Sequence, residues 1–558
     1  MDNNTIADNF SILSKLMDIH GDNSFKAKSY AAAAFTIEKL TIQLSEMPFD
    51  KIQSVRGIGA SIGKNVIEQI QTGSFSILQE YIQKTPEGIL TMMQIKGIGP
   101  KKIATIWKEL EIETIGELLY ACEENRLSNY KGFGEKSQQN IKEAISFYLG
   151  SQGSYLYQEI ENFTIHLQDN LEKKFSDFRF SIAGSFALHN EIISELCFIT
   201  TTPIPILEDF FTLQGFEIKL FTDNNLQVVN SLKLPIHFIK TTDDLFYNCV
   251  FEHSCSDTFL NAWKEQTNWN DSKSFSSDNA IFESNNIPFI PVYQRENASI
   301  IQDAIQKKLK PVIQVNDIKS IIHSHSNWSD GAEPLENMAS TAKEKGYEYL
   351  VISDHSQSAF YANGLRVERI VSQHQQIDEL NKKLHPFRIF KSIESDILND
   401  GGLDYSDDVL ESFDIVIASI HSNLKMTEEK AMMRLINAIE NPFTSILGHM
   451  TGRLLLSRNG YPVDHKRIID ACVANNVVIE LNAHPRRLDI DWRWIKEAID
   501  KGVLISINPD AHSIQGFDDC KYGVLVAQKA GLTKYQNLSS YSLADFEEFL
   551  MEQHQKRN

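Results

Sequence analysis

Residues 321–331 read Ile-Ile-His-Ser-His-Ser-Asn-Trp-Ser-Asp-Gly, and this stretch decides how the C-terminal half is interpreted. Its apolar start predicts a β-strand that ends in His323 and His325. Alternate side chains of a strand lie on one face, so we expect both imidazoles to point the same way. Imidazole binds borderline metals, and Asp330 follows on the predicted loop. One His-x-His pair is as often an ordinary surface pair, so the interpretation depends on repetition.

The same pattern recurs along the rest of the chain. Strand-like apolar runs occur at residues 349–353, 388–393, 415–420, 444–448, 477–481 and 503–507. These runs lead to ligand-type side chains at Asp354, His355, Glu394, His421, His449, Asn482, His484, Asp510 and His512. Segments of helical pattern separate them, including 334–345, 428–440 and 465–475. Strands that alternate with helices predict parallel βαβ units, and barrels of this kind carry their chemistry at the C-terminal strand ends. Packing histidines would be scattered, so we interpret these seven strand ends as one functional site.

The motifs at these strand ends resemble those of the polymerase-and-histidinol-phosphatase (PHP) domain. They read His-Ser-His, Ser-Asp-Gly, Ser-Asp-His-Ser, Glu-Ser-Asp-Ile, Ser-Ile-His, Gly-His-Met-Thr-Gly-Arg and Pro-Asp-Ala-His. The resemblance covers about residues 317–531 and implies a distorted seven-stranded (β/α) barrel with up to three divalent metal ions. It matches nine ligand positions: His323, His325, Asp330, His355, Glu394, His421, His449, Asp510 and His512. It also implies three ligand groups, with Glu394 bridging two ions: His323, His325 and Asp510; His421 and His449; Asp330, His355 and His512.

This ligand set predicts a phosphoesterase. Divalent ions held by imidazole and carboxylate lower the pKa of water and neutralise the charge of a phosphodiester. The mixture of nitrogen and oxygen ligands suits Mn²⁺ or Zn²⁺. Arg453 is a candidate catalytic phosphate clamp, because a guanidinium donates to two oxygens at once. Arg486 and Arg487 compete for that role, and either of these two is also explained as surface charge.

Composition limits the remaining possibilities. A chain of 558 residues should hold several domains, because single hydrophobic cores stop growing near ~250–300 residues. No apolar run reaches 18 residues and the start does not resemble a signal peptide, so we expect no membrane association. The six cysteines form no Cys-x-x-Cys pair, which is typical of free thiols in a cytoplasmic protein. The net charge of −20 argues against attraction of the whole protein to nucleic acid. However, residues 1–150 hold 16 Lys/Arg against 18 Asp/Glu, so the excess acid lies downstream.

A Gly-hydrophobic-Gly element occurs three times in the first 150 residues, each time with lysine close behind. The residues concerned are Gly57, Gly59 and Lys64; Gly97, Gly99, Lys101 and Lys102; and Gly132, Gly134 and Lys136. Arg56, Lys96 and Lys131 precede the three copies. Paired glycines let a backbone approach a ligand, and the next helix offers free N–H groups and a positive dipole end for phosphate. One copy would suggest a plain helix turn, but three copies resemble helix-hairpin-helix DNA-binding elements.

Residues 23–30 are similar to the opening domain of family X DNA polymerases, which holds gapped or nicked duplexes. Together with the C-terminal PHP motifs, the chain resembles bacterial family X polymerases. We therefore expect residues 1–80 to form a helical DNA-end-binding domain with the first hairpin, and 81–150 a further helix-hairpin-helix region. Residues 151–315 would form an α+β nucleotidyltransferase-like palm and thumb, and 316–558 the PHP domain. The implied partner is DNA that is gapped, nicked or 3′-ended, and protein partners are not indicated.

The middle region departs from that family. There, Gly-Ser is followed by a basic pair and then by Asp-x-Asp on a strand, whose two carboxylates hold two magnesium ions. Here Gly184 and Ser185 are followed by Ala187 and Leu188, and the carboxylate positions read Glu195 and Cys197. The third family aspartate falls at His237. Cysteine is a soft ligand that suits magnesium poorly, so we expect a scaffold without polymerase activity.

The leading hypothesis is a metal-dependent phosphoesterase of DNA ends in DNA repair. The expected activity is a 3′–5′ exonuclease, with 3′-phosphatase or abasic-site cleavage as related reactions. One alternative is a small-molecule phosphatase of the histidinol-phosphatase type, which would have no need of three hairpins. The other is a non-catalytic DNA-end-binding scaffold, which would have no need of nine matched ligands.

Overall fold

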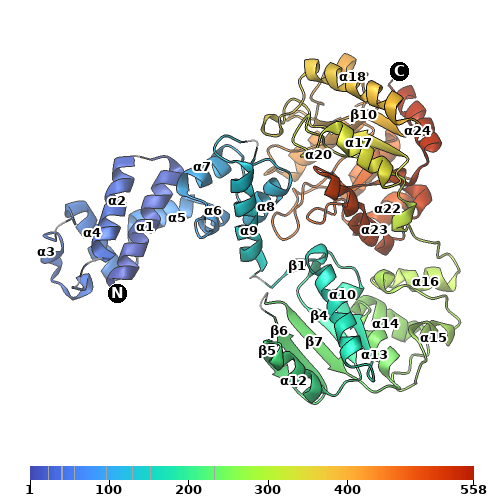
Figure 1. The fold of residues 1–558 in the computed structure, drawn as a ribbon, viewed down its shortest axis with the longest axis horizontal. Helices are drawn as coiled ribbons and strands as arrows, with labels where there is room; N and C mark the ends of the chain where they lie inside the picture. The colour runs from blue at the N-terminus through green and yellow to red at the C-terminus, as the bar shows by residue number, and fades with distance from the viewer. Residues whose placement is uncertain are drawn as a thin grey trace. The chain divides into compact units, whose positions relative to one another are not determined.

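The computed structural model describes residues 1–558 except for eleven positions. These are Asn23, Lys39, Thr41, Arg56, Lys96, Asn129, Ser151, Gln152, Ser231, Leu232 and Asn558. Arg56, Lys96 and Asn23 belong to motifs quoted above and therefore lie outside the described residues. The chain divides into two compact units, Met1–Glu123 with Tyr130–Tyr148, and Glu124–Asn129 with Leu149–Asn558 (Figure 1). Among the helices formed by the described residues, none is both long and apolar enough to cross a bilayer.

The first unit is helical. Its helices are α1 (Asn3–His20), α2 (Ser24–Glu38), α3 (Phe49–Ile52), α4 (Ala60–Thr72), α5 (Ser76–Lys84), α6 (Glu87–Met92), α7 (Pro100–Lys108), α8 (Ile115–Glu123) and α9 (Glu135–Gly150). Helix α1 begins where the Asp2 carboxylate accepts a hydrogen bond from the Thr5 N–H, and it ends at Gly21 in the left-handed conformation. Its Phe10 ring packs on Tyr30 and Phe75, at ring-centroid distances of 5.7 and 4.9 Å.

The three predicted glycine motifs share one backbone geometry. The first glycine of each, Gly57, Gly97 and Gly132, has a φ of +90°, +94° and +97°, a region that L side chains rarely adopt. The apolar residue that follows is buried in each copy. The second glycine directly precedes α4, α7 or α9. The first glycine therefore makes the turn, the apolar residue anchors it, and the second opens the helix.

The middle of the chain is a mixed α+β region, as predicted. Its five strands are β2 (Phe180–Ala183), β4 (Leu196–Thr200), β5 (Glu217–Phe221), β6 (Asn225–Val229) and β7 (Pro235–Lys240), in the order β2-β4-β7-β6-β5. Strands β4 and β7 are parallel and the other pairs are antiparallel. The short strands β1 (Tyr155–Leu156) and β3 (Ile192–Ile193) pair separately. The helices here are α10 (Tyr157–Lys174), α11 (Gly184–Ala187), α12 (Ile204–Leu213), α13 (Phe246–His253), α14 (Asp257–Gln266), α15 (Asp278–Glu283) and α16 (Ser299–Ile305).

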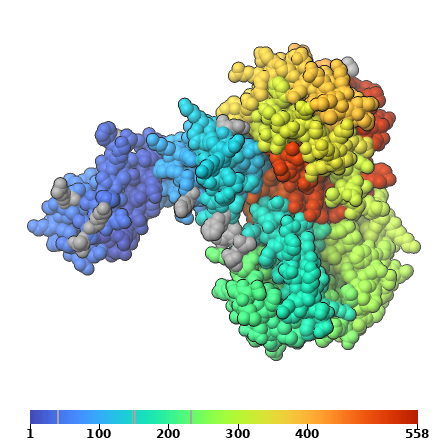
Figure 2. Space-filling view, viewed as in Figure 1, coloured from blue at the N-terminus to red at the C-terminus, as the bar shows by residue number. Residues whose placement is uncertain are grey.

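The C-terminal region is the predicted barrel, drawn from yellow to red in Figures 1 and 2. Its seven parallel strands follow chain order: β8 (Ser320–Ile321), β9 (Tyr349–Ile352), β10 (Arg388–Asp396), β11 (Ile415–Ser419), β12 (Ile446–Leu447), β13 (Val478–Asn482) and β14 (Ile505–Asn508). The helices are α17 (Leu335–Glu344), α18 (Val367–Leu384), α19 (Asp407–Leu410), α20 (Glu428–Glu440), α21 (His465–Ala474), α22 (Trp492–Asp500), α23 (Cys520–Lys529) and α24 (Leu543–Gln555). Beyond β8 and β14, the His325 N–H donates to the Ala511 carbonyl at 2.9 Å. This contact nearly closes the barrel at the C-terminal ends of its strands.

Two strand ends differ from the sequence prediction. Strand β8 stops at Ile321, and His323 has a φ of +63°, so the alternation argument for His323 and His325 was wrong. The left-handed turn, rather than a strand face, brings these two rings together with their centroids 5.2 Å apart. Strand β10 continues through Glu394 to Asp396, so that carboxylate projects from within the strand.

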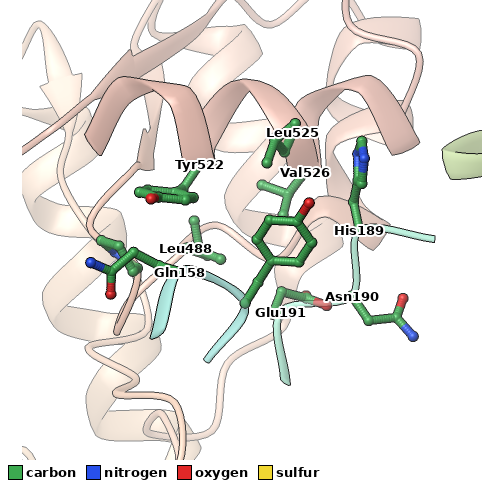
Figure 3. Close-up of a pocket in the computed structure, with 10 residues that line it drawn as sticks. Gln158, His189, Asn190, Glu191, Leu488, Tyr522, Leu525 and Val526 are labelled. Atoms are coloured by element: carbon green, nitrogen blue, oxygen red, sulfur yellow. The ribbon is translucent and has the colours of Figure 1, made fainter. Parts of the chain in front are cut away.

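Within the second unit, the middle region packs against the barrel through polar and apolar contacts. The buried ammonium of Lys529 on α23 donates to the Leu188 carbonyl at 2.6 Å and to Glu296 at 2.7 Å. Around a cavity of about 10 Å³, Tyr522 and Val526 of α23 lie opposite His189 and its neighbours (Figure 3). This volume holds about one water molecule, so the two surfaces are closely fitted.

Candidate metal centre

The nine side chains predicted as metal ligands converge at the C-terminal ends of the barrel strands. Eight of these residues are at most 6% exposed, and the ninth, His421, is partly exposed. Parallel strands deliver their C-terminal ends to one edge, which explains why residues almost 190 positions apart in sequence meet there. The His325 ring, for example, lies 3.0 Å from the Asp510 carboxylate, between Nε2 and Oδ1.

The side chains form three groups whose ligand atoms lie within 4.8 Å of one another. The groups are His323, His325 and Asp510; His355, Glu394 and His421; and His325, Asp330, His355 and His512. Each could hold a metal ion. They differ from the ligand groups implied by the sequence, because the group around Glu394 and His421 contains His355, and His449 belongs to none of the three. A fourth group adds Glu124, a residue of the second unit, to Asp510 and His512. No sequence pattern indicated Glu124.

Glu394 is the central carboxylate of the site. Its Oε1 lies 3.0 Å from His449 Nε2, 3.1 Å from His421 Nε2 and 3.3 Å from His323 Nε2. Its Oε2 lies 2.9 Å from His355 Nδ1. Contact with four imidazoles fits a carboxylate that is shared between ions.

Unsatisfied polar atoms test whether the site fits metal ions. Buried polar groups in proteins nearly always have hydrogen-bond partners, so several unsatisfied polar atoms in one place require an explanation. Within the described residues, eight ligand-set atoms are buried without a hydrogen bond of acceptable geometry, although His355 Nδ1 and Glu394 Oε2 lie 2.9 Å apart. They are His323 Nε2, His325 Nδ1, Asp330 Oδ2, His355 Nδ1, His355 Nε2, Glu394 Oε2, His449 Nδ1 and His512 Nε2. All are nitrogen or carboxylate oxygen atoms of the kinds that bind divalent ions. The donor set therefore fits metal binding.

The charges within the site reinforce one another. Burial alone would raise the pKa of Glu394, but the imidazoles of His421, His323 and His355 lower it well below its ordinary value. Burial would likewise raise the pKa of Asp510, and His323 is the first of the groups that lower it. These carboxylates therefore stay ionised and available as ligands.

Two further carboxylates contact ligand histidines from outside the set, and sequence reasoning missed both. Glu480 of β13 lies 2.6 Å from His323 Nδ1, and Asp396 at the end of β10 lies 2.6 Å from His421 Nδ1. For Glu480, the sequence did contain a signal of such a contact, because this acidic residue lies inside the apolar run 477–481. Burial of a lone carboxylate is costly, so such a residue needs a partner.

Arg453, the predicted phosphate clamp, has its guanidinium engaged within the barrel loops. It donates to Asp491 Oδ2 at 2.6 Å and to the Arg487 carbonyl at 2.9 Å. Arg487 lies nearer the ligands, with Nε 3.8 Å from Asp510 Oδ2. Arg486 instead reaches Glu159 of α10, at 3.1 Å. Among these three arginines, Arg487 is therefore the one with an ion pair to a predicted metal ligand.

The middle region brings together two of the positions that the sequence comparison predicts to correspond to polymerase aspartates. Cys197 on β4 and His237 on β7 are direct partners in the parallel pair, while Glu195 precedes β4 and is exposed. Burial raises the pKa of the Cys197 thiol to about 12, so it remains protonated at neutral pH. A neutral thiol is a poor ligand for a hard cation.

Comparison with known families agrees with this architecture. Residues 1–75 match the helix-hairpin-helix domain, residues 89–146 the SAM-like helix-hairpin-helix tandem, and residues 322–484 the PHP domain. These matches confirm that the N-terminal part contains helix-hairpin-helix domains and the C-terminal part a PHP domain.

Individual relatives differ in how much of the chain they cover. The chain is 34% identical over 562 residues to the DNA polymerase/3′-5′ exonuclease PolX of Bacillus subtilis, covering 96% of each chain. A protein named "Probable phosphatase" from Thermoanaerobacter sp. is 24% identical over 258 residues, 43% of this chain and 98% of its own. The "Probable phosphatase YcdX" of Escherichia coli is 27% identical over 220 residues, 36% of this chain and 82% of its own.

Proposed function

The chain belongs to the family of PolX DNA polymerase/3′-5′ exonucleases, and from that premise we propose that it hydrolyses phosphodiester bonds at DNA ends. The expected reaction is 3′–5′ exonucleolytic digestion, with removal of 3′-phosphates or cleavage at abasic sites as related reactions. The observation that carries the proposal is the convergence of nine buried or nearly buried imidazoles and carboxylates at one mouth of the barrel.

The nine residues would hold up to three Mn²⁺ or Zn²⁺ ions, eight of them in the three groups described above and His449 through its place beside Glu394. Ions held there would acidify water and offset the charge of the phosphodiester. Glu394 would keep two ligand groups at a fixed separation, because its carboxylate contacts four imidazoles. We propose that Arg487, rather than Arg453, donates hydrogen bonds to the scissile phosphate.

The helical first unit would bind the DNA backbone. The second glycines of the three motifs leave free space, since a Cβ built at Gly59, Gly99 or Gly134 would meet no atom of the described residues within 4 Å. A phosphate can therefore approach the N–H groups that open α4, α7 and α9. Lys64, Lys101, Lys102 and Lys136 follow within the first turns of these helices and would add positive charge. The favoured substrate is gapped, nicked or 3′-ended DNA.

The middle region would serve as a scaffold without polymerase activity. Glu195 is the one carboxylate at the three aligned positions, and it is exposed beside a buried neutral thiol. We accordingly assign residues 1–80 and 81–150 to DNA binding, 151–315 to a nucleotidyltransferase-like scaffold and 316–558 to hydrolysis.

Small-molecule phosphatase activity is the second candidate, favoured by the similarity to proteins named as probable phosphatases. The experiment that separates the candidates uses purified protein, Mn²⁺ and 5′-labelled gapped DNA, with and without dNTPs. A parallel reaction contains a small phosphate monoester. The proposal predicts progressive shortening of the labelled strand that EDTA abolishes. Intact DNA together with rapid hydrolysis of the monoester would establish the second candidate instead.

A further inference from the structure

Glu480 is a fully buried carboxylate outside the nine-residue ligand set. Its Oε2 accepts from His323 Nδ1 at 2.6 Å and from the Asn508 side-chain amide at 2.8 Å. Its Oε1 accepts from the His449 backbone N–H at 3.1 Å and from the Asn482 amide at 3.1 Å. A carboxylate offers about four acceptor sites, so these donors use its whole capacity.

The contact with Glu480 fixes how His323 presents its ring. An ionised carboxylate can only accept, so His323 Nδ1 must carry the proton, and the lone pair lies on Nε2. That Nε2 atom points to Glu394 Oε1 at 3.3 Å and to Asp510 Oδ1 at 3.4 Å. It has no hydrogen-bond partner among the described residues. Glu480 thus holds His323 in the tautomer and orientation that a metal ligand requires.

Glu480 also connects ligands from different groups. Besides His323, it holds the backbone of His449, whose Nε2 also lies near Glu394 Oε1, at 3.0 Å. Asn482, which donates to Glu480, also has its side-chain amide 3.0 Å from Asp510 Oδ2. One buried carboxylate therefore contributes to the positions of three ligands.

Asp396 makes the simpler version of this contact. Its Oδ1 lies 2.6 Å from Nδ1 of His421, and that imidazole is the one ligand ring with which it pairs among the described residues. Asp396 is thus a matched control, with the same chemistry and distance but a single ligand.

We propose that Glu480 is a positioning residue that orients His323 and His449 together and so couples two metal positions. This inference rests on the proposed metal-dependent function. Removal of Glu480 should disturb both positions, whereas removal of the Asp396 charge should disturb only the position that His421 serves.

The test compares Glu480→Gln with Asp396→Asn by metal content and by the absorption spectrum during Co²⁺ titration. Glutamine keeps the size of glutamate but has no charge and a single acceptor oxygen. Its NH2 group therefore opposes the donors on one side of the cluster, and its neutral oxygen binds those on the other side more weakly. We expect Glu480→Gln to weaken binding at two positions, each by about 10–100-fold, and Asp396→Asn at one. The melting temperature of each metal-free variant controls for folding. Glu480→Asp, which keeps the charge but shortens the reach, serves as a second variant if glutamine impairs folding.

Wild-type Co²⁺ affinity and spectrum in both Glu480 variants would overturn the inference. Equal effects of Glu480→Gln and Asp396→Asn, confined to one position, would also overturn it. If the wild-type protein bound no metal at all, the proposed function would fail together with the inference. A metal-binding wild type with an unaffected Glu480 variant would overturn the inference alone.

Discussion

The second glycines of the hairpins allow DNA binding to be separated from folding. Gly59 and Gly99 open α4 and α7 with φ values of −74° and −85°, an extended backbone that any residue adopts. A valine at either position would project into free space, because the described part of the chain places no atom within 4 Å of the added Cβ. Loss of a glycine cap should cost the fold at most about 1 kcal/mol.

The same substitution should cost DNA binding more. If each opening holds one phosphate through a charge-assisted hydrogen bond of about 1.5–3 kcal/mol, blocking it weakens binding roughly tenfold or more. The double variant Gly59→Val with Gly99→Val should therefore lose about 100-fold in affinity for gapped duplex. Gly57 and Gly97 are less suitable targets, because a side chain at their positive φ costs about 1–2 kcal/mol in strain.

Fluorescence anisotropy at one fixed salt concentration measures this loss, because phosphate contacts depend strongly on salt. The matched control is Gly73→Asn, at the other end of α4, where φ is +88° and asparagine is tolerated. Hydrolysis of a small phosphodiester should be the same in all variants. An unchanged dissociation constant in the double variant would show that these hairpins only pack.

Three further predictions address the rest of the chain. If Cys197 occupies a magnesium-ligand position, as the sequence predicts, no primer extension is expected on gapped DNA with any dNTP mixture and Mg²⁺ or Mn²⁺. Products longer than the primer would refute this. Burial and two nearby lysines lower the pKa of His189 from about 6.5 to about 4, so acidification between these values protonates only the unfolded chain. Over that pH range the free energy of unfolding of the wild-type protein should fall by about 3 kcal/mol, whereas that of His189→Asn should not. Equal losses in the two proteins would contradict this. Arg453→Ala should lower the free energy of unfolding by about 3 kcal/mol, and with it the melting temperature, because the substitution breaks a largely buried ion pair with Asp491. A raised KM for DNA together with an unchanged melting temperature would instead support Arg453 as the residue that binds the phosphate.

The barrel and its ligand positions could be predicted because their pattern repeats. A parallel barrel has little freedom in where its strands end, so polar residues after successive apolar runs must meet at one mouth. His421 and Asp510 could be grouped this way without any knowledge of side-chain contacts. The three glycine motifs were predictable for a similar reason, because a positive φ nearly requires glycine.

Contacts between side chains from distant strands could not be predicted. Glu480 reaches His323 across 157 positions of sequence, and nothing near either residue indicates that they meet. The left-handed turn at His323 was also hidden, since strand alternation assumes an extended backbone. Arg453 stands in a recognisable motif, but its partner Asp491 lies on another loop.

Glu394 provides the most direct test of the central claim that this mouth hydrolyses DNA. Glu394→Ala and His421→Ala should abolish digestion of a 5′-labelled single strand in Mn²⁺ and should lower the bound metal measured by mass spectrometry. His484→Ala is the control, because this partly exposed residue lies on the same side of the barrel but outside the ligand set, and it should keep most of both. DNA binding by the first unit should persist in all three variants. Near wild-type digestion by Glu394→Ala would place the active site elsewhere and contradict the account.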